Sequence, residues 1–142
     1  MFHKILHGHD GSAGASLALE TAIRLARENQ AELHMICVEE MPYFPTSIDE
    51  VIEERNEENH RFRKVIGRAQ GQAAAQAVTL HAHVVAGHAV RDIVGFIEGH
   101  GIDLLVVGFM GHSALYDRII GSTAERLVRL APCSVMVVKG QV

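Results

Sequence analysis

The sequence predicts an α/β domain built on a parallel sheet. Strand-like and helix-like hydrophobic patterns alternate along the chain, five of the first kind and four of the second. Such alternation is typical of a parallel sheet with helices on both faces. Residues 104–107, Leu-Leu-Val-Val, form a continuous apolar run, which indicates a strand buried on both sides. With 142 residues, 48% of them hydrophobic, we expect a single three-layer domain spanning residues 1–142.

The individual elements follow from hydrophobic spacing and from turn residues. The first strand ends at the turn signal Asp10-Gly11-Ser12, and apolar residues then recur at helical spacing. Ser47 and Glu50 have the spacing of a capping box before a long helix whose first half is heavily charged. We expect strands at residues 2–9, 32–38, 78–85, 103–108 and 134–139. We expect helices at residues 13–30, 47–76, 89–99 and 122–131, the last one ended by Pro132.

Charge and composition exclude several classes of protein. The formal net charge is −4 with both signs scattered, which argues against a nucleic-acid-binding surface because such surfaces show a basic patch. The sequence contains no run of eighteen apolar residues that would indicate a membrane span. Its N-terminus lacks the pattern of a signal peptide. We therefore expect a cytoplasmic protein, in which Cys37 and Cys133 are reduced thiols.

The strongest functional motif is Gly108-x-x-Gly111-(nine residues)-Gly121-Ser122-Thr123. Glycines let a backbone approach a ligand closely, and successive amides in a glycine-rich turn bind anions. The N-terminus of the helix that begins here adds free N–H groups and a positive dipole end. The two hydroxyl groups can donate to phosphate oxygens. The motif therefore predicts a phosphate-binding loop, and the alternative is a plain surface loop with an ordinary helix cap.

Topology points to the same place. In open parallel sheets, ligands bind beyond the carboxyl ends of the strands where the strand order reverses. The loops at residues 8–12 and 108–121 should therefore form the site. An aspartate in the first loop can accept hydrogen bonds from ribose hydroxyls, although an Asp-Gly turn that only caps the next helix is the alternative. The candidate ligand-binding residues outside the motif are Gly8, His9, Asp10, His112 and Arg118.

These features resemble the universal stress protein family over essentially the whole chain. The resemblance is carried by the Asp10-Gly11-Ser12 turn, by the glycine motif, and by residues 131–138, Ala-Pro-Cys-Ser-Val-Met-Val-Val. It implies strand order 3-2-1-4-5 and a bound ATP or AMP, with magnesium or manganese between the phosphates. It also implies a homodimer formed through the last strand, residues 135–138.

The resemblance also assigns roles to individual residues. It implies that Asp10 contacts the ribose and that Val38, at the end of the second strand, meets adenine through its backbone. The residues that it places around the phosphates are Gly108, Gly111, Gly121 and Ser122. One departure concerns the end of the first strand, which is apolar in the family and reads His7-Gly8-His9 here.

The ten histidines are unusual for a chain of this length. Alternate residues of a strand share a face, so histidines on three neighbouring strands could form a metal site or a pH-sensitive cluster. The residues in question are His3, His7, His9, His34, His81 and His83. No accompanying Cys, Asp or Glu completes a recognisable ligand set, so we expect strand-end histidines bonded to backbone or water, and no metal site.

The sequence thus favours a stress-response regulatory protein that binds an adenine nucleotide. The alternative is a dimerisation module of the same fold that binds no nucleotide. A phospho-receiver domain needs an aspartate at the end of the third strand, and residues 84–88 contain none. A flavin protein is poorly supplied with aromatic side chains. Slow ATP hydrolysis has only Asp10 and His112 as candidate bases, so we assign no catalytic residue.

Overall fold

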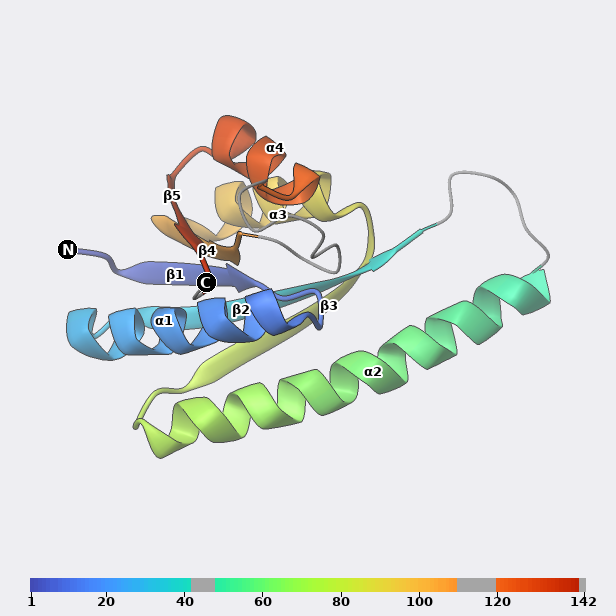
Figure 1. The fold of residues 1–142 in the computed structure, drawn as a ribbon, viewed down its shortest axis with the longest axis horizontal. Helices are drawn as coiled ribbons and strands as arrows, with labels where there is room; N and C mark the ends of the chain where they lie inside the picture. The colour runs from blue at the N-terminus through green and yellow to red at the C-terminus, as the bar shows by residue number, and fades with distance from the viewer. Residues whose placement is uncertain (42–47, 110–119, 141–142) are drawn as a thin grey trace.

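The computed structural model describes residues 1–41, 48–109 and 120–140, and within residues 48–61 it describes the backbone alone. The described residues form one α/β domain in which strands and helices alternate (Figure 1). The elements are β1 (Lys4–Gly8), α1 (Ala13–Asn29), β2 (Glu32–Glu40), α2 (Ile48–Ala75), β3 (Leu80–Gly87), α3 (Ala89–His100), β4 (Leu104–Gly108), α4 (Ser122–Leu130) and β5 (Ser134–Val138).

The five strands form a parallel sheet in the order β3-β2-β1-β4-β5, so the predicted architecture is confirmed. Leu6 on the central strand β1 pairs with His34 of β2 and with Leu105 of β4. Figure 1 shows α1 and α2 on one face of the sheet, and α3 and α4 on the other. The strand order therefore reverses between β1 and β4, whose following helices leave to opposite faces.

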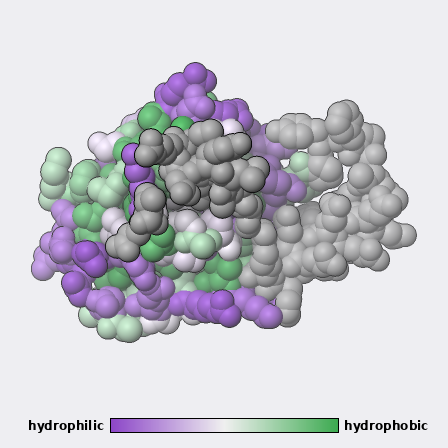
Figure 2. All heavy atoms as spheres, viewed as in Figure 1, coloured by the Kyte–Doolittle hydropathy of each residue, from purple (hydrophilic) through white to green (hydrophobic). Residues whose placement is uncertain are grey.

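Two hydrophobic cores hold the layers together, one on each face of the sheet. The first joins α1 and α2 to the sheet and includes Ile5, Ala22 and Phe62. The second joins α3 and α4 to the opposite face and includes Leu6, Ile93 and Leu127. The alternation of Ile5 and Leu6 between the two cores follows from the two-residue period of a strand. Hydrophilic residues cover the outer sides of α4 and of the C-terminal half of α2 (Figure 2).

The strands differ from their predicted ranges at their ends; the first is shorter at both ends, Lys4–Gly8 in place of 2–9. The differences in the second and third strands have local causes. The second strand continues past Val38 to Glu40, because Glu39 and Glu40 pair with Ala86 and Gly87 of β3. The third strand begins at Leu80 because Val78 still donates its N–H to the carbonyl of Ala73 at the end of α2. Within the described ranges, no helix is long and apolar enough to span a membrane.

Candidate functional site

The carboxyl ends of β1 and β4 define the candidate site. Ile5, Leu6 and His7 of β1 pair with Leu104, Leu105 and Val106 of β4. Beyond this pairing the two strands lead to opposite faces of the sheet: β1 is followed by α1 on one face, and β4 precedes α4 on the other (Figure 1). An open edge between diverging loops is where parallel sheets of this type bind ligands.

Hydrogen bonds from backbone amides to side chains fix the turn between β1 and α1. The Gly11 N–H donates to Nδ1 of His9 at 2.9 Å, and the Ser12 N–H donates to Oδ1 of Asp10 at 3.0 Å. Ser12 is the N-cap of α1, and its hydroxyl oxygen accepts from the Ala15 N–H at 3.1 Å. Gly11 has φ +84°, which only glycine adopts without strain. The turn therefore places the exposed residue Asp10 just beyond the carboxyl end of β1.

Asp10 does not cap α1, which was the alternative to a ligand-binding function for this residue. The cap of α1 is Ser12, whereas Asp10 closes a turn two residues long. An Asp side chain that bonds the N–H two residues ahead is a common turn former. This bond uses Oδ1 of Asp10, so a structural function of the carboxylate is certain whichever ligand the site binds.

Gly108, at the end of β4, is a glycine because of helix packing. A Cβ atom at this position would lie 2.9 Å from the carbonyl carbon and oxygen of Gly14 and 3.2 Å from the Ala15 nitrogen. The first turn of α1 therefore crosses the end of β4 at backbone contact distance. The sequence interpretation explained Gly108 by approach to a ligand, and this packing constraint is an additional cause that the motif alone did not reveal.

Backbone hydrogen bonds hold together the two ends of the glycine-rich loop. The Phe109 N–H donates to the carbonyl of Val138 at 2.9 Å, which extends the pairing of β4 with β5. The Gly121 N–H donates to the carbonyl of Phe109 at 2.8 Å. The start of α4 is therefore fixed beside the end of β4. The predicted loop residues Gly111, His112 and Arg118 lie outside the described residues.

The N-terminus of α4 is capped by a residue that has no side chain. Gly121 is the N-cap, with φ −61° and ψ 149°, and it makes no side-chain cap hydrogen bond to the first helical amides. A Ser, Thr or Asp at this position would normally accept from one of those amides. The first N–H groups of a helix have no partner within it, so a glycine cap leaves them for an external acceptor. The exposed side chains of Ser122 and Thr123 lie at the same end.

Val38 does not end its strand, contrary to the expectation. It pairs with Val85 of β3 and is half-buried on the face covered by α3 and α4. The His9 N–H donates to the carbonyl of Ile36, and beyond this bond β1 turns away towards α1. The Val38 backbone thus lies next to the point where β1 leaves the sheet. Val38 therefore lies near the first loop, although it stands two residues before the end of β2 and does not end the strand.

The histidines form two separate groups on opposite faces of the sheet. His7 and His9 lie on the face covered by α1, with their ring centroids 5.2 Å apart. His34 stacks on His81 and His83 and is 5.8 Å from the ring of Phe96 on α3. The alternative of one histidine cluster across three strands, which the sequence did not favour, is therefore contradicted. Within the described residues, no group of three or more His, Cys, Asp or Glu has the geometry of a metal site.

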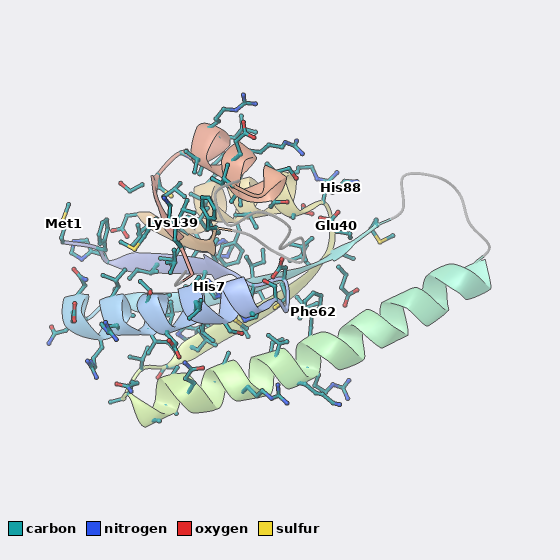
Figure 3. All side chains as sticks on the ribbon, in the orientation of Figure 1. Met1, His7, Glu40, Phe62, His88 and Lys139 are labelled. Carbon is teal, nitrogen blue, oxygen red and sulfur yellow. The ribbon has the colours of Figure 1, made fainter. Side chains whose placement is uncertain are left out.

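His7 is fully buried and uncharged. Burial lowers its pKa from 6.5 to about 3, against the raising effect of the Val106 carbonyl. Because a carbonyl only accepts, Nδ1 of His7 must donate to Val106, at 2.9 Å. Nε2 of His7 is then the unprotonated nitrogen, and no described residue donates to it. Figure 3 shows His7 between α1 and the sheet.

The second histidine group is a hydrogen-bonded chain at the β2–β3 side of the sheet. Nε2 of His34 donates to the Glu32 carboxylate at 2.6 Å. A second hydrogen bond, 2.9 Å long, joins Nδ1 of His34 to Nε2 of His83. This bond from His34 lowers the pKa of Glu32, and burial lowers the pKa of His83. Sequence reasoning missed the contribution of α3, where Phe96 and His100 stack at 3.8 Å; their four-residue spacing was the available signal.

Glu40 has a structural function that the sequence interpretation, which placed it in a loop, did not include. Its Oε1 accepts from the Ala89 N–H at 3.0 Å, and its Oε2 lies 3.6 Å from Nδ1 of His88 (Figure 3). The carboxylate thereby caps the N-terminus of α3, where negative charge is favourable. This contact joins the carboxyl end of β2 to α3.

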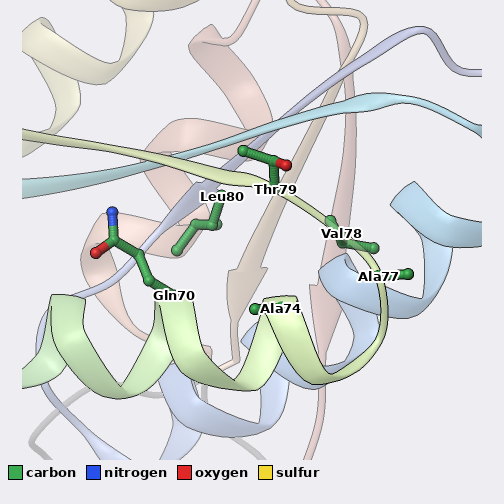
Figure 4. A pocket seen from close by; sticks show the side chains of 6 residues that line it. All are labelled: Gln70, Ala74, Ala77, Val78, Thr79 and Leu80. Atoms are coloured by element: carbon green, nitrogen blue, oxygen red, sulfur yellow. The ribbon is translucent and has the colours of Figure 1, made fainter.

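A surface hollow at the opposite end of the sheet is a poorer candidate. It lies where α2 leads into the amino end of β3 (Figure 4), away from the crevice between β1 and β4. Its lining contains no charged group that could bind a phosphate. The residues that line it are Gln70, Ala74, Ala77, Val78, Thr79 and Leu80.

Strand order and helix placement define the class of this protein, a doubly wound α/β domain whose strand order reverses between its first and fourth strands. Residues 1–139 match the family model described as "Universal stress protein family". The chain belongs to the universal stress protein family.

Individual relatives agree with this assignment. The universal stress protein YxiE of Bacillus subtilis is 31% identical over 151 residues, covering 98% of this chain and 100% of that protein. A universal stress protein of Methanocaldococcus jannaschii is also 31% identical, covering 98% of this chain and 83% of the relative. The structure of universal stress protein UspA from Lactobacillus plantarum superimposes with a TM-score of 0.89 at 27% identity, covering 97% of this chain and 98% of that one.

Proposed function

We propose that this protein binds an adenine nucleotide, ATP or AMP, and acts as a stress-response regulatory protein. The observation that carries the proposal is the glycine-capped N-terminus of α4, held by the Gly121–Phe109 bond beside the carboxyl end of β4. Helix N-termini of this kind bind phosphate. Two structural neighbours support the choice of ligand: one universal stress protein was solved in complex with cAMP, and one from Arabidopsis thaliana with AMP bound.

The proposed binding mode follows the arrangement of the crevice. The phosphates lie against the backbone of Gly108 and Gly121 and the hydroxyls of Ser122 and Thr123, while Asp10 accepts from the ribose. The backbone of Val38 faces adenine. Magnesium or manganese, where present, lies between the phosphates. The remaining proposed contacts are the backbone of Gly8 and His9 and, outside the described residues, Gly111, His112 and Arg118.

Gly121→Val tests the phosphate site directly. The φ and ψ of Gly121 are allowed for any residue, so the fold should persist. The branched side chain would occupy the space in front of the α4 amides, and we expect ATP affinity to fall about a hundredfold or more. Isothermal titration calorimetry measures the affinity, with the exposed, non-contacting Gly99→Ala as the control. Unchanged affinity in Gly121→Val would refute the phosphate-site assignment.

The alternative function is a dimerisation module without a nucleotide, and ligand identification separates the two. Mass spectrometry of the denatured protein should release ATP or AMP, and added ATP should raise the melting temperature. Absence of both effects would favour the module. Binding is the primary activity in this proposal, because the described residues of the crevice include no evident base for ATP hydrolysis other than Asp10, which already accepts the Ser12 N–H.

We also propose that two copies pair through β5. This strand is hydrogen-bonded to β4 on one side and is the last of the described sheet, and its residues Val135–Val138 are apolar and half-buried. An apolar edge strand is a pairing surface unless something covers it. Sedimentation velocity should give the mass of a homodimer at micromolar concentration. A monomer over the whole concentration range would contradict this proposal without affecting nucleotide binding.

A further inference from the structure

His9 lies directly beneath the turn that presents Asp10 to the crevice. Its side chain is 5% exposed, so it does not face a ligand. Its Nδ1 accepts the Gly11 N–H at 2.9 Å, which bridges the residues on either side of Asp10. The edge of one ring faces the plane of the other in the contact with His7, at an interplanar angle of 81°. His9 therefore packs against His7 on one side and accepts the hydrogen bond of the turn on the other.

The hydrogen bonds determine the protonation state of this pair. A backbone N–H only donates, so Nδ1 of His9 carries a lone pair, and in the neutral ring the proton is on Nε2. His7 cannot move to compensate, because its Nδ1 donates to the Val106 carbonyl inside the sheet. Three consecutive bonds then order the turn: Gly11 to His9, Ser12 to Asp10, and Ala15 to Ser12.

We propose that His9 is a positioning residue for the nucleotide: by accepting the Gly11 N–H it orients the Asp10 carboxylate towards the ribose, and its protonation releases the turn and weakens nucleotide binding. This inference rests on the proposed function. A protonated Nδ1 would oppose the Gly11 N–H with a second donor, so the bond must break. The turn that carries Asp10 would then lose the bond that joins Gly11 to His9.

The surroundings of His9 set the direction of the pH dependence. Burial lowers the pKa of His9 below 6.5, and the Asp10 carboxylate partly opposes this effect. His7 stays neutral throughout. The last pair of β1 with β2 is Gly8 with Ile36, and beyond it β2 continues through the titratable residues Cys37 and Glu39. The first turn of α1 and the end of β4 add no titratable side chain. Affinity is therefore retained at neutral pH and decreases on acidification, as the pH falls through the lowered pKa of His9.

Two substitutions separate the acceptor from the titratable group. His9→Asn keeps an oxygen that can accept the Gly11 N–H but cannot gain a proton in this range, whereas His9→Leu removes the acceptor. Calorimetric ATP titrations between about pH 8 and pH 5 compare both with the wild type. Because the terminal phosphate of ATP gains a proton in the same range, the comparison between proteins, not the wild-type curve alone, isolates His9.

We expect His9→Leu to bind roughly tenfold more weakly at neutral pH, since one ordering hydrogen bond is lost. His9→Asn should bind like the wild type at neutral pH and lose less affinity on acidification. The exposed His3→Asn should follow the wild-type curve. Parallel pH curves for wild type and His9→Asn, or wild-type affinity that rises in acid relative to His9→Asn, would overturn the inference.

A measurement without nucleotide distinguishes failure of the inference from failure of the proposed function. Nitrogen-15 chemical shifts of the imidazole in the free protein report which ring nitrogen carries the proton. We expect an unprotonated Nδ1 at neutral pH, and a protonated Nδ1 would overturn the inference alone. Absence of ATP binding by the wild type at every pH would overturn the proposed function, and with it the role of His9.

Discussion

Gly108→Ala is expected to lower the free energy of unfolding by about 3 kcal/mol, a large part of the 5–15 kcal/mol typical of a domain. The added methyl group would meet the backbone of Gly14 at 2.9 Å. A flexible side chain could move away from such a contact, but a carbonyl in the first turn of a helix cannot. Either α1 must shift away from β4, or the end of β4 must leave the sheet. Urea denaturation measures the change.

The matched control is Gly99→Ala, an alanine introduced at an exposed position of α3 with no atom within 4 Å of the new Cβ. There the substitution should stabilise the protein by about 0.5–1 kcal/mol, because glycine is unfavourable inside a helix. Opposite signs for the same substitution would establish that the contact with α1 is the cause. An equal effect at both positions would contradict the packing argument. Gly108→Ala should also weaken ATP binding, since α1 begins at the Asp10 turn.

The fold was predictable because every level of the sequence agrees on it. The apolar run at Leu104–Val107 marked a central strand, and the structure places β4 between β1 and β5. The turn at Asp10 and Gly11 was recognisable because glycine supplies the positive φ that the turn requires. Signals of this kind are local in the sequence, so they can be recognised without knowledge of the tertiary structure.

Features that depend on contacts distant in the sequence could not be predicted. Glu40 was assigned to a loop because it follows an apolar strand and precedes a proline. The structure extends β2 through it by pairing with Gly87 of β3, and its carboxylate caps a helix that begins 49 residues further along the chain. Similarly, nothing in the sequence near Gly108 indicates that the first turn of α1 crosses it.

The candidate site was predictable in part. Topology brought the loops after β1 and β4 to one edge of the sheet, and the structure describes the Asp10 turn and the start of α4 there. The sequence left the arrangement of the histidines open, because their two-residue spacing gives a shared face only within one strand. The pairing of Leu6 with His34 puts His34 on the face opposite to His7, and only the register between strands determines that.

Phe62→Ala is expected to cost about 3–5 kcal/mol, the range for removing a buried aromatic side chain. Phe62 is 1% exposed and lies between α2 and the sheet (Figure 3). Figure 1 shows that the first turns of α2 extend beyond the sheet, so the helix depends on the contacts that follow. Ala69 and Ala73 are the next fully buried residues along it, and both are small. Val65 and Ile66 pack against the same core while only half-buried, so Phe62 is the largest fully buried side chain among the described residues of α2.

The loss of stability in Phe62→Ala should be greatest in one segment of the structure. Hydrogen exchange should increase first in the N-terminal half of α2, since an isolated helix of that length is marginal in water. The exposed neighbour Arg63→Ala should change stability by less than about 0.5 kcal/mol. If Phe62→Ala unfolds the chain with uniform exchange over all elements, the helix is not a separately attached segment. If nucleotide affinity of the folded protein is unchanged, α2 is not part of the crevice, which lies between β1 and β4.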